Sequence, residues 1–136
     1  MRAVVLAAGD GGRLAPHTGS VPKPLVDLAG KPIIGYTLEG LAAAGVDEVI
    51  VVTGYGEQHV MRALSGRRPT WPPLRFVSNA RYERGASYSL RAAHQVAGRD
   101  PCLLVMSDHL LSGSLLRRLP AAAVGGLAGR SDIAAD

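Results

Sequence analysis

The chain has 136 residues, enough for one modest domain, and 47% of them are hydrophobic. No apolar run is long enough to cross a membrane, and the single cysteine permits no intrachain disulfide, so we expect a cytoplasmic protein. The net charge of +4 comes from scattered arginines without a clustered basic face, which argues against nucleic-acid binding.

Strand and helix patterns alternate along the chain. Short apolar runs rich in Val, Ile and Leu predict strands, and apolar residues at helical spacing, such as Ile34, Leu38 and Leu41, predict helices. In chain order we expect a strand over residues 2–8, a helix over 33–44, a strand over 48–52, a helix over 57–64, a strand over 74–77, a helix over 87–96, a strand over 102–106 and a short helix over 115–119. This alternation predicts an α/β fold, a Rossmann-like parallel sheet with helices on both faces.

The predicted strand order places two polar segments together. If the four strands lie in the order 3-2-1-4, the first and fourth are neighbours and flank the point where ligands bind to such sheets, at the carboxyl ends. Gly9 then follows the first strand and Asp108 follows the fourth. We therefore expect the two segments to face each other. We treat residues 1–136 as a single, incomplete domain with a weakly structured tail over 121–136.

A glycine-rich loop follows the first strand. It contains Gly9, Gly11 and Gly12, and two cations come after it, Arg13 and then Lys23, which stands between two prolines. Glycines let backbone N–H groups approach an anion closely, and two nearby cations indicate a phosphate chain.

Two better-known glycine loops are excluded. A P-loop requires Gly-Lys-Ser/Thr, but Gly30-Lys31 is followed by Pro32. The dinucleotide fingerprint requires a third glycine where this chain has Leu14, and the predicted second strand carries no acidic residue at its tip.

Three ordered segments carry a resemblance to a known family. They read LAAGDGGRLAPHT at 6–18, PKPL at 22–25 and GKPI at 30–33. In these segments the chain is similar to the sugar-phosphate and polyol-phosphate nucleotidyltransferases, which are GT-A-like NTP transferases. The resemblance implies that the phosphate of a sugar or polyol phosphate attacks the α-phosphorus of an NTP, giving an NDP-conjugate and pyrophosphate.

The resemblance also implies roles for individual residues. The backbone at the end of the first strand would hold the base and the ribose, and the glycines would bind the triphosphate. Lys23 would bind the α-phosphate or the incoming phosphate. Asp108 would bind a Mg²⁺ ion. The implied nucleotide-binding residues at this end of the sheet are Leu6, Ala7, Ala8, Gly9, Gly11, Gly12, Arg13 and Lys23. The implied catalytic residues are Arg13, Lys23 and Asp108.

Two further segments narrow the subfamily. The segments VMSDHL at 105–110 and NARYERGASYSL at 79–90 resemble regions of the inositol-phosphate and choline-phosphate cytidylyltransferases. This likeness implies CTP as the nucleotide, with GTP or UTP next. It makes Asn79, Gly85 and Ser87 candidate base contacts, in what we call the base-contact segment (residues 79–87). Ser87 as the cap of the following helix is the competing interpretation.

The chain departs from the family in its length. Relatives of this kind continue with acceptor-binding strands and a second metal-binding aspartate, and nothing after Asp108 resembles them. We therefore expect an open sheet edge, covered by a partner chain or a second copy. The alternatives are a fragment, a truncated chain completed by a partner, or a nucleotide-binding or regulatory protein with weak or no catalysis. A molybdenum-cofactor nucleotidyltransferase is a further alternative, although such enzymes lack PKPL and GKPI in this form.

Overall fold

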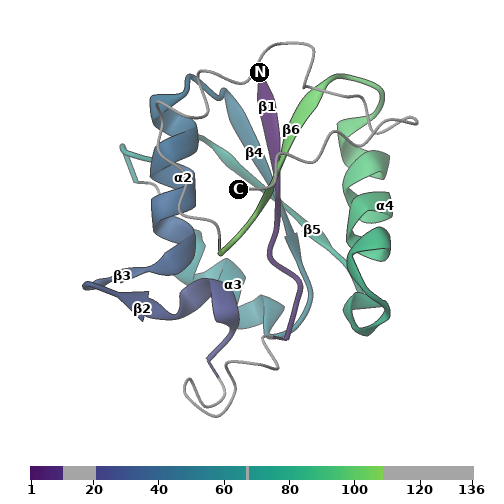
Figure 1. Cartoon of the computed structure of the whole chain (residues 1–136), viewed down its shortest axis with the longest axis horizontal. Coiled ribbons are helices and arrows are strands. Elements are labelled where there is room, and N and C mark those ends of the chain that lie inside the picture. Colours follow the sequence, from purple (N-terminus) through teal and green to yellow (C-terminus); the bar gives the residue numbers. More distant parts are fainter. Residues whose placement is uncertain (11–20, 67, 109–136) are drawn as a thin grey trace.

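A computed structural model describes residues 1–10, 21–66 and 68–108, and its centre is a parallel sheet (Figure 1). The strands are β1 (Arg2–Leu6), β4 (Glu48–Thr53), β5 (Leu74–Ser78) and β6 (Cys102–Met106), in the order β5-β4-β1-β6. β1 is paired on both sides, so that Leu6 at its end is opposite Val52 of β4 and Met106 of β6. The predicted order, with the first and fourth strands as neighbours, is confirmed.

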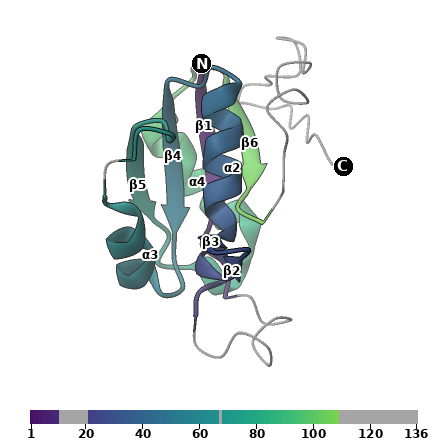
Figure 2. The ribbon, with the colours of Figure 1, turned by 90° about the vertical axis from the view of Figure 1, so that its left-hand side faces the viewer.

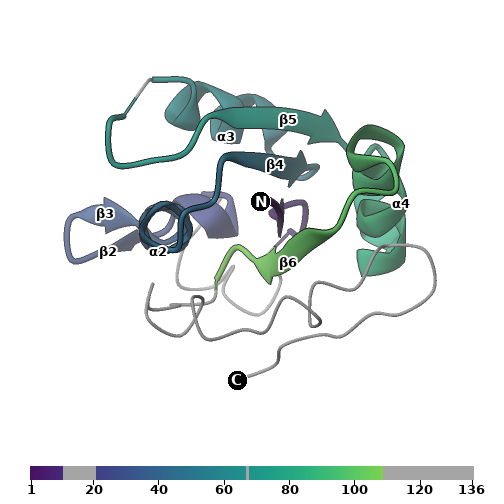
Figure 3. The same cartoon turned by 90° about the horizontal axis from the view of Figure 1, so that it is seen from above.

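Helices cover both faces of this sheet. Figure 1 shows α2 (Ile33–Ala43) and α3 (Glu57–Leu64) on one side and α4 (Ala86–Ala97) on the other. Viewed from the side of α2, that helix lies in front of the sheet and α4 behind it (Figure 2), and the view from above shows the same three layers (Figure 3). The predicted α/β fold with helices on both faces is confirmed.

β1 and β6 are mostly apolar because each face of the sheet is covered there, whereas the edge strand β5 carries the exposed Arg75 and Ser78. Side chains alternate between faces along a strand, so Ala3 and Val5 of β1 pack with α2 and α3, whereas Val4 and Leu6 pack with α4. Burying both rows removes nearly all of the strand's apolar area from water, which is the main stabilising contribution to such a core.

Most predicted elements agree with the structure to within one or two residues, but four short ones were missed. These are two 3-10 turns, η1 (Lys23–Leu25) and η2 (Tyr82–Arg84), and an antiparallel pair, β2 (Asp27–Leu28) with β3 (Lys31–Pro32). The pair is joined by Ala29 and Gly30, both with positive φ, which matches the twist of a tight hairpin. Runs of two or three residues are too short to show a periodic pattern.

Several expectations fall beyond this description. The predicted helix over 115–119 and the tail over 121–136 lie outside the described residues, as do Gly11, Gly12 and Arg13. Within the described ranges, no helix has both the length and the apolar character needed to cross a membrane.

Candidate active site

The end of β1 is held on both sides by backbone hydrogen bonds. The Ser107 N–H donates to the Leu6 carbonyl (3.1 Å), the Ala7 N–H to the Val52 carbonyl (2.9 Å), and the Tyr55 N–H to the Ala8 carbonyl (3.0 Å). The side chains of residues 6–8 are buried, whereas Gly9 is exposed and a Cβ there would meet nothing within 4 Å. A rigid, buried strand end thus leads into an open glycine, the arrangement expected beneath a bound ligand.

Lys23 and Asp108 form an ion pair at this edge of the sheet. The Lys23 Nζ lies 2.6 Å from Asp108 Oδ2, and about a third of each side chain is exposed, 33% and 29% respectively. Asp108 follows β6 by two residues, and Lys23 is in η1. The tertiary structure therefore brings together two side chains that sequence analysis placed in one catalytic set.

Prolines hold Lys23 in position. Pro22 and Pro24 on either side of it are buried, and the Leu25 N–H donates to the Pro22 carbonyl (2.9 Å) to close the turn. Pro22 packs so closely on Gly56 that a Cβ there would lie 2.5 Å from its Cγ. Since proline also fixes its own φ, the base of the Lys23 side chain has little freedom, and only its flexible stem can move.

Asn79, a candidate base contact, lies at the end of β5 and is 5% exposed. Its Nδ2 donates to Ser89 Oγ (2.9 Å) and its Oδ1 accepts from the Arg81 N–H (2.9 Å). Its backbone N–H donates to the Thr53 carbonyl (2.7 Å). Sequence analysis did not single out Ser89 or Thr53. Ser89 is the fourth residue of α4 and is buried.

The other two candidate base contacts are exposed. Gly85 has a φ of +98°, a conformation that favours glycine, and it precedes α4 as the N-cap without a side-chain capping bond. Ser87 is exposed and lies inside the first turn of α4. The interpretation of Ser87 as the helix cap is therefore wrong, because the helix begins one residue before it.

Gly54 joins the first strand's end to the base-contact segment. A Cβ at Gly54 would lie 2.6 Å from Tyr82 Cβ and 2.9 Å from both the Cβ and the carbonyl oxygen of Ala8. Tyr82 also meets the Tyr55 ring edge to face, with the ring centroids 6.1 Å apart. The absence of a side chain at Gly54 lets η2 pack directly against the end of β1.

Comparison with known proteins identifies the family. The sequence model of the MobA-like NTP transferase domain matches residues 3–135. The chain belongs to this family. Solved structures similar to this NTP transferase domain include a nucleotidyl transferase from Methanothermobacter (TM-score 0.72, 37% identity, 89% of this chain and 56% of that one). The inositol-1-phosphate CTP transferase from T. maritima is also similar (TM-score 0.66, 28% identity, 85% of this chain and 46% of that one).

Relatives of the domain differ in the base that their names specify. Glucose-1-phosphate thymidylyltransferase from Streptomyces antibioticus is 32% identical over 115 residues, which is 85% of this chain and 32% of that protein. CMP-5'-(3-aminopropyl)phosphonate synthase from Streptomyces rubellomurinus is 38% identical over 123 residues, which is 90% of this chain and 19% of that protein. The chain thus spans a third or less of either relative. The predicted resemblance to sugar-phosphate nucleotidyltransferases is confirmed, whereas the base is not distinguished.

The chemistry of Asp108 fits a magnesium ion bound together with phosphates. In the part of the chain that the structure describes, no group of three or more His, Cys, Asp or Glu side chains could hold a metal ion alone. Mg²⁺ is typically held by one or two carboxylates plus substrate phosphates and water. A single carboxylate at the strand end is consistent with that mode and inconsistent with a closed, all-protein metal site.

Lys31 and Cys102 have structural roles. The Lys31 Nζ lies 2.5 Å from Glu39 Oε2 and 4.4 Å from the centre of the Tyr36 ring, and both partners belong to α2. Cys102 is buried in β6, and this burial raises the pKa of its thiol, an effect that nearby Arg2 partly offsets. Cys102 is therefore a core residue.

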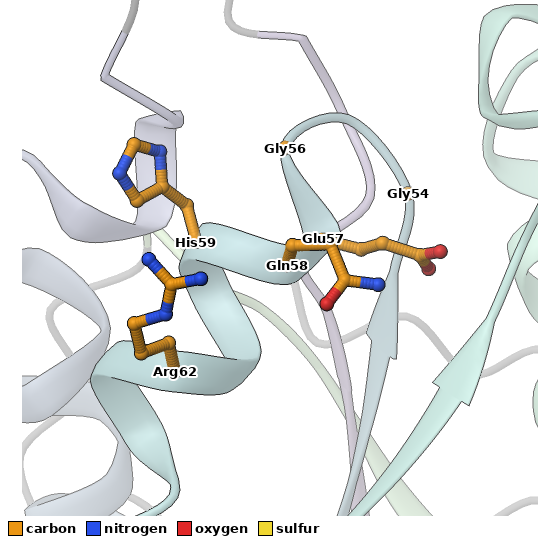
Figure 4. Close-up of a pocket in the computed structure, with 6 residues that line it drawn as sticks. All are labelled: Gly54, Gly56, Glu57, Gln58, His59 and Arg62. Atoms are coloured by element: carbon orange, nitrogen blue, oxygen red, sulfur yellow. The ribbon is translucent and has the colours of Figure 1, made fainter.

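An open pocket of about 420 Å³ lies at the start of α3 (Figure 4). Its lining residues are Gly54, Gly56, Glu57, Gln58, His59 and Arg62. Figure 4 shows His59 and Arg62 on one side of the helix start, while the carboxylate of Glu57 points the other way, past Gly54. Of the predicted site residues that the structure describes, none lines this pocket. Its lining residue Gly56 packs on Pro22, which precedes Lys23.

Proposed function

We propose that the chain binds a nucleoside triphosphate, with CTP preferred, across the carboxyl ends of β1 and β6. It would transfer the nucleotidyl group to a sugar or polyol phosphate, giving an NDP-conjugate and pyrophosphate. The observation that carries the proposal is the contact between Lys23 and Asp108 at 2.6 Å. It places a cation and a carboxylate at the position where doubly wound sheets bind their ligands.

The reaction requires charge neutralisation more than covalent catalysis. An oxygen of the acceptor phosphate forms a bond to the α-phosphorus, and the bond from that phosphorus to the oxygen of the leaving pyrophosphate breaks. Lys23 would then bind a phosphate oxygen in place of Asp108, and Asp108 would ligate Mg²⁺. When bound, that ion supplies further positive charge against the phosphate oxygens.

Support for CTP comes from two observations. The base-contact segment resembles those of cytidylyltransferases, and one similar solved structure is an inositol-1-phosphate CTP transferase. The segment also lies beside β1, because Tyr82 packs on Gly54 next to Ala8. Gly85 and Ser87 are exposed there and available to a base.

The test measures binding and turnover separately. CTP, UTP, GTP, dTTP and ATP are titrated calorimetrically into the purified chain with Mg²⁺ present, and pyrophosphate release is followed with sugar and polyol phosphates. Lys23→Ala is compared with Lys31→Ala, a matched control, because both lysines lie in ion pairs of similar exposure. Asp108→Asn tests the metal role.

We expect selective CTP binding that is lost in Lys23→Ala and retained in Lys31→Ala. Asp108→Asn should abolish the magnesium dependence of binding. Binding without pyrophosphate release would favour the nucleotide-binding module over the transferase. A chain that binds none of the five nucleotides would contradict the proposal. A cytoplasmic location and a second chain along the edge of β6 stay predictions.

A further inference from the structure

One carboxylate ties the carboxyl ends of β4 and β5 together. Glu57 Oε2 accepts a hydrogen bond from Ser78 Oγ at 2.6 Å, and Thr53 Oγ1 lies 3.3 Å from the same oxygen. Thr53 is the last residue of β4 and Ser78 the last of β5. The Thr53 hydroxyl is also 3.3 Å from the Val77 carbonyl, so its single hydrogen can serve one of the two acceptors at a time. The Ser78 hydroxyl lies 2.6 Å from the carboxylate oxygen and the Thr53 hydroxyl 3.3 Å from it, so the Ser78 contact is the stronger of the two.

The connection continues into the base-contact segment through Asn79. This residue follows Ser78 directly, and its backbone N–H is bonded to Thr53, the other residue that Glu57 contacts. Its side chain accepts a hydrogen bond from the Arg81 N–H within the segment and donates one to Ser89 on α4. The amide group of Asn79 is thus engaged on both its oxygen and its nitrogen, and the residue is almost fully buried. Such a side chain holds the protein's own backbone in place.

We propose that Glu57 and Asn79 are positioning residues for base recognition. Glu57 holds the ends of β4 and β5 together through its contacts with Thr53 and Ser78. Asn79 holds the backbone of the base-contact segment against these strand ends through its hydrogen bonds. Gly85 and Ser87 then contact the base. This inference rests on the proposed function, and it changes the role of Asn79 from base contact to support. Without the carboxylate, the segment must be ordered when the nucleotide binds, which reduces affinity for the base.

The first test needs no nucleotide. Amide hydrogen exchange is measured in the full chain for the wild type, Glu57→Ala and Glu57→Gln. The matched control is Glu48→Ala, which removes the same charge from the opposite end of β4. We expect faster exchange across the base-contact segment in Glu57→Ala alone, with α2 unchanged. Glu57→Gln should behave as the wild type because its amide oxygen can still accept from Ser78.

The second test separates base recognition from phosphate binding. CTP and inorganic tripolyphosphate are titrated into each variant, since tripolyphosphate keeps the phosphate chain of the nucleotide but lacks its ribose and base. We expect Glu57→Ala to weaken CTP binding by about tenfold and to leave tripolyphosphate binding unchanged. Glu57→Gln, which loses the same charge, controls for electrostatics. Equal losses for both ligands, or no loss in either measurement, would overturn the role of Glu57.

Asn79 is tested through its partner. Ser89→Ala removes the acceptor of the Asn79 side chain without altering Asn79 itself. We expect it to speed exchange in the base-contact segment and to weaken CTP binding in the same direction as Asn79→Ala. If Asn79→Ala loses CTP binding with unchanged exchange, and Ser89→Ala matches the wild type, Asn79 is a base contact and its positioning role is wrong. A wild type that binds no nucleotide would contradict the proposed function, whereas wild-type CTP binding with unchanged Glu57→Ala would contradict only this inference.

Discussion

Gly54→Ala tests whether the tight packing between the end of β1 and η2 matters. The added Cβ would lie 2.6 Å from Tyr82 Cβ and 2.9 Å from two atoms of Ala8, one of them a backbone oxygen. Non-bonded carbons normally stay about 3.5–4.0 Å apart, so the neighbours must shift by roughly 1 Å. They cannot do so by rotating a side chain, because the contacted atoms lie on or next to the backbone.

The expected cost follows from measurements on overpacked cores, which lose about 1–3 kcal/mol of unfolding free energy. An unfolding entropy of about 2.1 cal/mol/K per residue amounts to about 0.3 kcal/mol/K for a chain of this length. Dividing the cost by this entropy predicts that Tm falls by about 3–10 °C. The variant should also bind nucleotide more weakly, since the shift would separate Ala8 from the base-contact segment.

The assay is thermal unfolding followed by circular dichroism and by the fluorescence of Trp71, the sole tryptophan, which is buried. Gly66→Ala is the control, because a Cβ there would meet nothing within 4 Å and its φ is not positive. If the two variants melt within about 1 °C of each other, the packing argument fails, since that gap is below the smallest shift expected.

Further predictions concern the core, one surface ion pair and the buried thiol. Leu38→Ala, at a fully buried position in α2, should lower the unfolding free energy by about 2–5 kcal/mol in urea titrations, and a loss below about 1 kcal/mol would contradict its place in the core. Lys31→Met should cost at most about 1 kcal/mol in the same titrations despite the 2.5 Å contact with Glu39, since both side chains are about one-third exposed and water screens the pair. Cys102 should react with iodoacetamide at pH 8 far more slowly in the native protein than in urea. Burial raises the pKa of the Cys102 thiol, so the native state keeps the thiol proton to higher pH than the unfolded state does. The contribution of this thiol to the unfolding free energy should therefore be complete below about pH 8.5 and decline above it. If a Cys102→Ala variant shows the same alkaline decline in unfolding free energy, this explanation is wrong.

The alternation of strands and helices could be predicted from local patterns. Residues 3–6 of β1, 49–52 of β4 and 102–106 of β6 form unbroken apolar runs because both faces of the sheet are covered, and such runs are visible in the sequence. The bounds of α3 and β6 were predicted to the residue, since the Gly56 and Pro101 that precede them are breakers of regular structure. The short pair β2–β3 was missed because it depends on a positive φ at Ala29, which alanine rarely adopts.

Most of the helices and strands, the family and the candidate site residues follow from the amino-acid sequence alone, because hydrophobic periodicity and ordered motifs are local properties of the chain. Which of these side chains meet depends on the tertiary structure. The contact between Lys23 and Asp108, the closeness of Tyr82 to Ala8 over Gly54, and the burial of Asn79 against Ser89 all join residues from separate elements. Such contacts depend on strand order and on how the helices pack against the sheet, since these bring distant segments together once the core is formed.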